Sequence, residues 1–186
     1  MRIAVISQKG GSGKTTLCIN LAVAANYNII DTDPQLSATA FGQLRASLVG
    51  KAPVVSTSAD GDVLIDTPPH SNLATSLMLK GVDVVIVPVK PTALDVHAAS
   101  ATLRQIAAIG VPAIAVITMA ITRTGDGEET RAMLDKLGIS VADTVIHNRV
   151  TYGRSIASGQ GVTEYEPNGL AAQEINALLQ EILSNG

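Results

Sequence analysis

The chain is short of aromatic residues and cysteine, and each shortage excludes a class of protein. Its 186 residues include one Phe, three Tyr and no Trp, which is poor material for a surface that binds nucleic acid by stacking on bases. The single cysteine, Cys18, excludes an internal disulfide and offers no metal-ligand spacing. Because it falls inside an expected helix, we expect Cys18 to be a small buried apolar residue.

Long apolar runs and basic residues near the C-terminus are also missing. No apolar run reaches the ~18 residues of a membrane span, and the N-terminus enters an apolar strand without a signal peptide. These features predict a cytoplasmic protein. The net charge of −3 means that any DNA binding needs a local basic patch, for which the candidates are Arg104, Arg123, Arg131, Lys136 and Arg154.

The last predicted helix, Gly169–Leu183, has an apolar face formed by Ala171, Ile175, Leu178, Leu179 and Ile182. Its opposite face carries Gln173, Glu174, Gln180 and Glu181, and no Lys or Arg follows Arg154. Binding to an anionic membrane surface needs basic residues beside the apolar face. We therefore expect this helix to pack on the core, and no membrane partner.

Apolar runs alternate with helical patterns along the whole chain. This order predicts an α/β fold, with one mostly parallel, doubly wound sheet, helices on both faces and right-handed crossovers, in a single domain over residues 1–186. The predicted strands are Arg2–Ser7, Asn28–Ile30, Asp62–Ile65, Val82–Val89, Val111–Thr118 and Thr144–His147. The predicted helices are Lys14–Ala25, Ser37–Leu48, Asn72–Lys80, a helix that ends near Gly110, Glu128–Leu137 and Gly169–Leu183, with a loop at Met119–Gly127.

A glycine-rich segment between the first strand and the first helix carries the clearest chemistry. It reads Lys9-Gly10-Gly11-Ser12-Gly13-Lys14-Thr15-Thr16. Glycines allow backbone N–H groups to curl around a polyphosphate, and the N-terminus of the following helix adds partial positive charge. Lys14 is expected to reach the β- and γ-phosphates, and the Thr15 hydroxyl to bind Mg²⁺. The usual P-loop pattern opens with glycine, but this chain has Gln8 there and an additional lysine, Lys9.

Carboxylates follow the next two strands. The segment Asp31-Thr32-Asp33-Pro34-Gln35 follows the second strand, and Asp66-Thr67-Pro68-Pro69 follows the third. Carboxyl ends of parallel strands border the crevice in which doubly wound sheets bind ligands. Asp66, at the end of an apolar strand, therefore has the position of the Walker B carboxylate, which contacts the Mg²⁺ ion through a bound water.

Taken together, these motifs resemble those of the ParA/MinD ATPase superfamily, whose P-loop deviates in the same way. The segment Pro91-Thr92-Ala93-Leu94-Asp95 resembles a segment at the dimer face of that family. The resemblance implies bound ATP and Mg²⁺ and an ATP-dependent homodimer in which Lys9 reaches the phosphates held by the partner subunit. It also implies that Asp31 holds a metal-bound water and that Asp33 orients the attacking water. The single cysteine disfavours the nitrogenase iron protein relatives, which bridge an iron–sulfur cluster with two cysteines per subunit.

By the same resemblance, the loop after the last strand borders the adenine, which makes Asn148 and Arg149 candidates for contacts to the base. The catalytic candidates are Lys9, Lys14 and Asp33, the nucleotide-binding candidates run from Gly10 to Thr16, and the metal candidates are Thr15, Asp31 and Asp66. His97 is expected to be a surface or interface histidine without a catalytic role. The span between Leu48 and Asp62 is short for the family, which suggests a small member that lacks a peripheral segment.

Two functions remain open from the sequence, and the first is the preferred one. In the first, a partition ATPase binds DNA without sequence preference in its ATP state and segregates plasmid or chromosomal DNA with an adaptor of the ParB kind, so that it is associated with the nucleoid. In the second, the ATP dimer positions a protein cargo or regulates a partner, with little affinity for DNA. A kinase or ligase on the same fold is less favoured, because Lys9 and the Asp31–Gln35 motif argue against it and no acceptor site is evident.

Overall fold

A computed structural model describes residues 1–51, 55, 61–69 and 80–185. In this part of the chain the strands form a six-stranded parallel sheet in the order β2-β3-β1-β4-β5-β6, which confirms the predicted α/β class. The strands are β1 (Arg2–Val5), β2 (Asn28–Asp31), β3 (Val63–Asp66), β4 (Val84–Val89), β5 (Ala113–Ala120) and β6 (Ile146–His147). The helices are α1 (Lys14–Ala25), α2 (Ser37–Val49), α4 (Ala93–Ala108), α5 (Asp126–Lys136), α6 (Val150–Ala157), α7 (Val162–Tyr165) and α8 (Leu170–Asn185).

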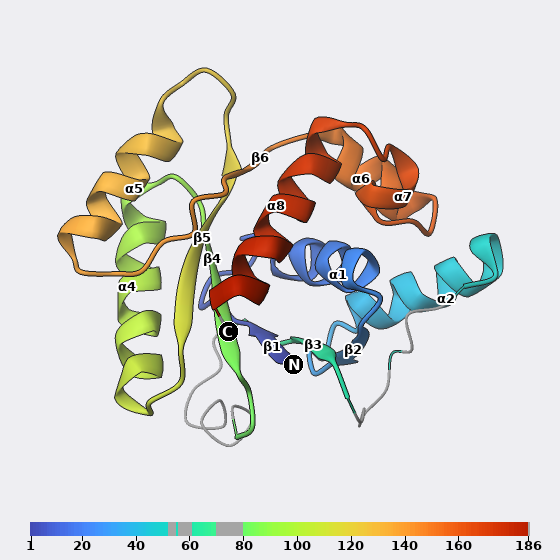
Figure 1. Ribbon diagram of the computed structural model, residues 1–186, viewed down its shortest axis with the longest axis horizontal. Coiled ribbons are helices and arrows are strands. Elements are labelled where there is room, and N and C mark those ends of the chain that lie inside the picture. The colour runs from blue at the N-terminus through green and yellow to red at the C-terminus, as the bar shows by residue number, and fades with distance from the viewer. Residues whose placement is uncertain (52–54, 56–60, 70–79, 186) are drawn as a thin grey trace.

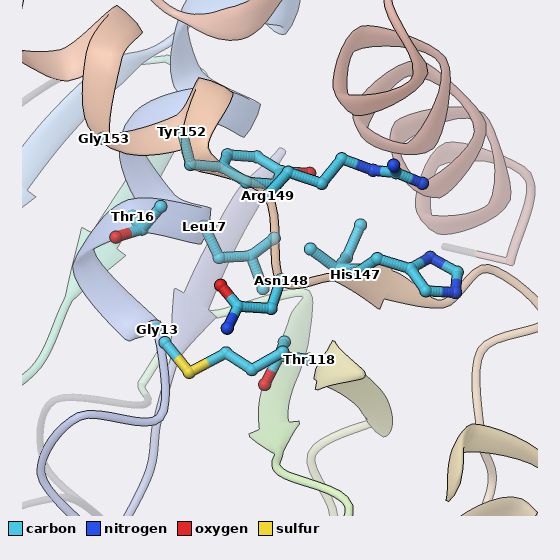
Figure 2. A pocket seen from close by; sticks show the side chains of 11 residues that line it. Gly13, Thr16, Leu17, Thr118, His147, Asn148, Arg149, Tyr152 and Gly153 are labelled. Atoms are coloured by element: carbon cyan, nitrogen blue, oxygen red, sulfur yellow. The ribbon is translucent and has the colours of Figure 1, made fainter. Parts of the chain in front are cut away.

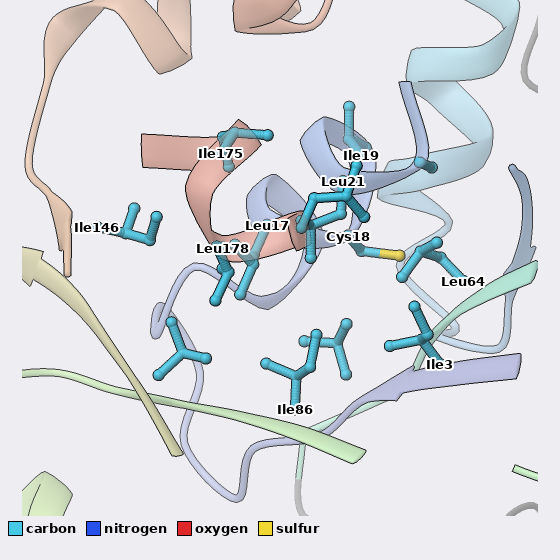
Figure 3. Packing of buried hydrophobic residues seen from close by; sticks show 14 of the residues in the cluster. Ile3, Leu17, Cys18, Ile19, Leu21, Leu64, Ile86, Ile146, Ile175 and Leu178 are labelled. Atoms are coloured by element: carbon cyan, nitrogen blue, oxygen red, sulfur yellow. The ribbon is translucent and has the colours of Figure 1, made fainter. Parts of the chain in front are cut away.

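Helices cover both faces of the sheet (Figure 1). Successive residues of a strand point to opposite faces, and β1 shows this directly. Ile3 and Val5 pack with α1 and α8, whereas Ala4 belongs to the cluster that includes α4 and α5. Figure 3 shows the cluster formed by the sheet, α1 and α8, in which Cys18 lies between the apolar side chains of α1 and the sheet. Cys18 is fully buried, as predicted, and its burial raises the pKa of the thiol.

The C-terminal helix packs on the core, as expected from its apolar face. Ala171, Ile175, Leu178, Leu179 and Ile182 are all buried, and α8 contacts α1, α7 and β6. Within the described residues, no helix is long and apolar enough to cross a membrane.

Several predicted boundaries need correction. The segment predicted as a loop from Met119 begins inside β5, which continues to Ala120, and its end is helical because α5 begins at Asp126. The predicted strand Thr144–His147 is reduced to Ile146–His147, because the N–H groups of Asp143 and Thr144 donate to the carboxylate of Glu181 on α8 instead of to a strand. Helices α6 and α7 were not predicted. The predicted helix Asn72–Lys80 lies outside the described residues except for Lys80.

Candidate functional site

The glycine-rich loop adopts a conformation in which its backbone turns around a central space. Gly11 and Gly13 have φ values of 70° and 84°, a region that residues with a Cβ rarely adopt. Gly13 is also the N-cap of α1, so its left-handed backbone leads directly into the helix at Lys14. The Thr118 hydroxyl donates to the carbonyl of Ser12 over 3.0 Å and so fixes the loop to the end of β5. This arrangement presents a helix N-terminus and the largely buried Lys14 to an anion.

The second lysine of the motif lies away from its own loop. The Lys9 ammonium is 3.4 Å from Oδ1 of Asp95, in the first turn of α4. Asp95 is held in place because the Thr92 hydroxyl donates to its other oxygen while Thr92 caps α4. The Lys9 side chain is partly exposed. It contacts the segment Pro91–Asp95, for which the sequence predicted a role at a dimer face.

A third lysine, which the motifs did not indicate, also reaches the loop. Lys90 directly follows β4, which pairs with β1, and its Nζ lies 3.6 Å from the position that a Cβ on Gly11 would occupy. Among the described residues, no acidic side chain forms an ion pair with Lys90. No local pattern could have found Lys90, since only the pairing of β4 with β1 brings it to the loop.

Asp66 is the most unusual carboxylate of the structure. It is fully buried, and neither of its oxygens accepts a hydrogen bond of ordinary geometry from the described residues. Burial raises its pKa from 3.8 to about 6; the carboxylates of Asp31 and Asp33 also raise it, whereas the nearby Thr15 hydroxyl and Lys14 lower it. A buried carboxylate without a partner is costly, and a cation beside it would remove the cost.

The other two predicted carboxylates lie close to Asp66, but they already have hydrogen-bond partners. Asp31 stands opposite Asp66 in the β2–β3 pairing. Its Oδ2 accepts bonds from the N–H and the hydroxyl of Thr39, and its Oδ1 accepts one from the N–H of Asp33. Asp33 is nearly buried and accepts a bond from the N–H of Gln35. The Asp31 carboxylate thus also holds the first turn of α2 next to the site.

A cavity of about 190 Å³ begins where the loop enters α1. It is lined by Gly13, Thr16, Leu17, Thr118, Met119, Ile146, His147, Asn148, Arg149, Tyr152 and Gly153. Both residues predicted to contact adenine therefore border it. Figure 2 shows that they differ: Asn148 points toward Gly13, while the guanidinium of Arg149 and the imidazole of His147 point the other way.

Glu174 of α8 explains the orientation of Arg149. Its Oε1 accepts bonds from Nη2 of Arg149 over 2.6 Å and from Nε over 3.1 Å, and lies 2.8 Å from Nδ1 of His147. Its Oε2 accepts from the N–H of His147 and from the Tyr152 hydroxyl. This pairing raises the pKa of Arg149. Arg149 is thus a support for the wall of the cavity, and its guanidinium does not face the space where the base is expected.

The chain is similar to a known family of nucleotide-binding proteins over most of its length. The family model of the CobQ/CobB/MinD/ParA nucleotide binding domain matches residues 3–162. The chain belongs to this family. The members of this family are nucleotide-binding ATPases of the ParA/MinD type.

Individual relatives extend the similarity over nearly the whole chain. The Maintenance of carboxysome distribution protein A of Halothiobacillus neapolitanus is 25% identical, over 97% of this chain and 95% of its own length. Among solved structures, apo McdA of Cyanothece matches with a TM-score of 0.74 at 15% identity, over 97% of this chain and 98% of that one. MinD of Pyrococcus horikoshii in complex with Mg-ADP also has a TM-score of 0.74, at 18% identity, over 97% of this chain and 95% of that one.

Proposed function

We propose that this chain is an ATPase whose ATP-bound homodimer positions a protein cargo through a partner protein on that cargo. The observation that carries the proposal is the place of Lys9. Its ammonium lies on Asp95 at the surface beside the loop, and it does not cover its own phosphate site. A second subunit that docks on this face would exchange the partly exposed ion pair for contact with a polyphosphate, a stronger partner for a cation than one carboxylate.

Hydrolysis in this proposal depends on positioning and on charge. The N–H groups of the loop and Lys14 would bind the phosphates, and Lys9 of the partner would neutralise charge that develops during phosphoryl transfer to water. Asp33 would orient that water from its position beside Asp66. Because the site of one subunit lacks this second lysine, turnover by the monomer should be slow.

The residues present fit a magnesium ion. Asp66 has two buried oxygens to which no described residue gives a hydrogen bond of ordinary geometry, and the Thr15 hydroxyl is close by. Hydroxyl and carboxylate oxygens are the ligands that Mg²⁺ takes alongside phosphate. Thr15 would bind the ion directly, and Asp66 and Asp31 would hold its water ligands. When bound, the ion would neutralise charge on the phosphates. The related MinD structure contains Mg-ADP.

The choice of a protein cargo over DNA rests on two findings. The Halothiobacillus and Gloeobacter kilaueensis relatives, each 25% identical, are both named for carboxysome distribution. In addition, Arg131, one of the five basic residues considered for DNA, is bonded to the carbonyls of Ala142 and Asp143 and lies 3.7 Å from the carboxylate of Asp143. DNA segregation with an adaptor of the ParB kind is therefore the second candidate.

Light scattering coupled to size-exclusion chromatography tests the dimer, with Mg²⁺ and either ATP or ADP. We expect dimers with ATP only. Lys9→Ala should abolish the dimer and hydrolysis while leaving the binding of ATP by the monomer unchanged, and Lys136→Ala, at an exposed lysine of α5, is the control. Unchanged hydrolysis in Lys9→Ala would refute the role of Lys9.

Fluorescence anisotropy with a random-sequence DNA duplex separates the two candidates. Binding that needs ATP and weakens steeply with salt would make DNA the surface on which the dimer acts. No binding under conditions where the dimer forms would exclude DNA segregation. Transfer of phosphate to a small molecule by a monomer would instead support a kinase.

A further inference from the structure

Met119 interrupts the pairing of β5 with β6. Thr118 stands opposite Ile146 and Ala120 opposite His147, with a shift in register between the two pairs. Met119 is therefore an extra residue in β5, and its φ of +57° is left-handed. Residues other than glycine adopt this conformation rarely and at a cost in free energy.

The flanking residues hold this bulge in place. Thr118 donates its hydroxyl to the carbonyl of Ser12 in the glycine-rich loop. Ala120 accepts a hydrogen bond of 2.9 Å from the N–H of Asn148. The bulge thus lies between the phosphate-binding loop and the loop after β6, and both ends of it are tied to residues of the site. Bulges near functional sites commonly redirect a side chain.

Here the redirected side chain enters the cavity. The Met119 Cε lies 3.6 Å from the position that a Cβ on Gly13 would occupy, and Met119 lines the cavity together with Leu17, Asn148 and Tyr152. Met119 as a residue is 36% exposed, so it is not closed off from the open space. The thioether adds a flexible apolar wall to the cavity, on the side toward which Asn148 also points (Figure 2).

We infer that Met119 packs against the base of the bound nucleotide, and that the left-handed bulge exists to place it there. The inference rests on the proposed function. The loop and the N-terminus of α1 fix the phosphates at Gly13 and Thr16, and the cavity starts at the same two residues, so the sugar and base extend into it. The sulfur of methionine makes favourable contacts with aromatic rings and adapts its shape to them.

Isothermal titration calorimetry with ATP, ADP and inorganic tripolyphosphate, each with Mg²⁺, tests the inference. Met119→Ala should weaken ATP and ADP binding about 2- to 10-fold, the range expected for loss of a thioether–ring contact. Tripolyphosphate has no base, so its affinity should stay unchanged. Met119→Leu, which keeps the apolar bulk, should retain most of the affinity. Met133→Ala, at an exposed methionine of α5, is the matched control.

Other outcomes overturn the inference. Unchanged ATP affinity in Met119→Ala would mean that the side chain does not touch the base, and tighter ATP binding would mean that it blocks the cavity. Equal weakening for tripolyphosphate would mean that the substitution distorts the loop. Met119→Gly, which suits a positive φ, repeats the test without backbone strain. If the unmodified protein bound no nucleotide at all, the proposed function itself would fail.

Discussion

Two glycines with the same backbone conformation provide a test of how closely α2 packs against the turn after α6. Gly138 and Gly159 both have a φ of 69°, and each donates its N–H to a carbonyl at the end of the preceding helix. A Cβ at position 138 would meet nothing within 4 Å, whereas a Cβ at position 159 would lie 2.9 Å from Cα of Arg45 and 3.4 Å from the carbonyl oxygen of Leu44. Both atoms near position 159 belong to the backbone of α2, which, unlike a side chain, cannot rotate away.

We therefore expect Gly138→Ala to cost about 1 kcal/mol, the penalty for a left-handed alanine. Gly159→Ala adds overpacking of about 1–3 kcal/mol, for a total of about 3 kcal/mol. The shift needed to relieve the clash also lengthens the 2.9 Å hydrogen bond from Nη1 of Arg45 to the Gly159 carbonyl.

Urea unfolding followed by circular dichroism measures both changes. With a slope of about 2 kcal/mol per M, the midpoints should fall by about 0.5 M for Gly138→Ala and about 1.5 M for Gly159→Ala. Equal losses in the two variants would show that α2 does not pack on the turn after α6.

Three further predictions follow from single contacts. Glu174→Gln should lower the free energy of unfolding by about 2–4 kcal/mol, because Arg149 loses its charged partner in a largely buried site. The same variant should weaken ATP binding. Thermal unfolding measures the first effect and titration calorimetry the second, with Gln173→Ala as the control. Lys90→Gln should weaken tripolyphosphate and ATP binding several-fold, while Lys80→Gln should not; equal affinities would place Lys90 outside the phosphate site. Arg45 lowers the pKa of Glu164 below 4.5, so the stability from this pair is present above pH 4.5 and is lost as the pH falls through the lowered pKa. The urea midpoint of Glu164→Gln should therefore lie below that of the wild type at pH 7, and the two midpoints should converge at acidic pH.

The fold could be predicted well because its signals are local. The glycine-rich loop fixes where β1 ends and where α1 begins, and the predicted helix Lys14–Ala25 has the observed bounds. The apolar faces of the strands and of α8 were also readable from their periods. The errors fall where tertiary contacts override local pattern. Strand β6 is shorter than predicted because Glu181, distant in sequence, accepts the N–H groups of Asp143 and Thr144.

The site was predictable to the extent that its chemistry is carried by motifs. Lys9, Lys14, Asp31, Asp33 and Asp66 lie where the sequence placed them, around one loop and the ends of neighbouring strands, while their roles stay predictions. Arg149 illustrates the limit. Its position beside the cavity follows from the strand before it, but the direction of its side chain depends on Glu174. The sequence gives no reason to connect an acid in a C-terminal helix with a basic loop.

Asp66 and Arg45 show why an unpaired buried group can indicate function. Among the described residues, the buried side-chain atoms without a hydrogen bond are both oxygens of Asp66 and Nε of Arg45. Arg45 bonds through its other nitrogens to Glu164 and to the carbonyl of Gly159, so one missing bond costs little. Asp66 lacks a partner for either oxygen, and its raised pKa reflects the resulting cost of holding charge. A folded chain tolerates such a cost where a ligand removes it, and the neighbouring Thr15 and Lys14 support the proposal of a magnesium-bound polyphosphate at this place.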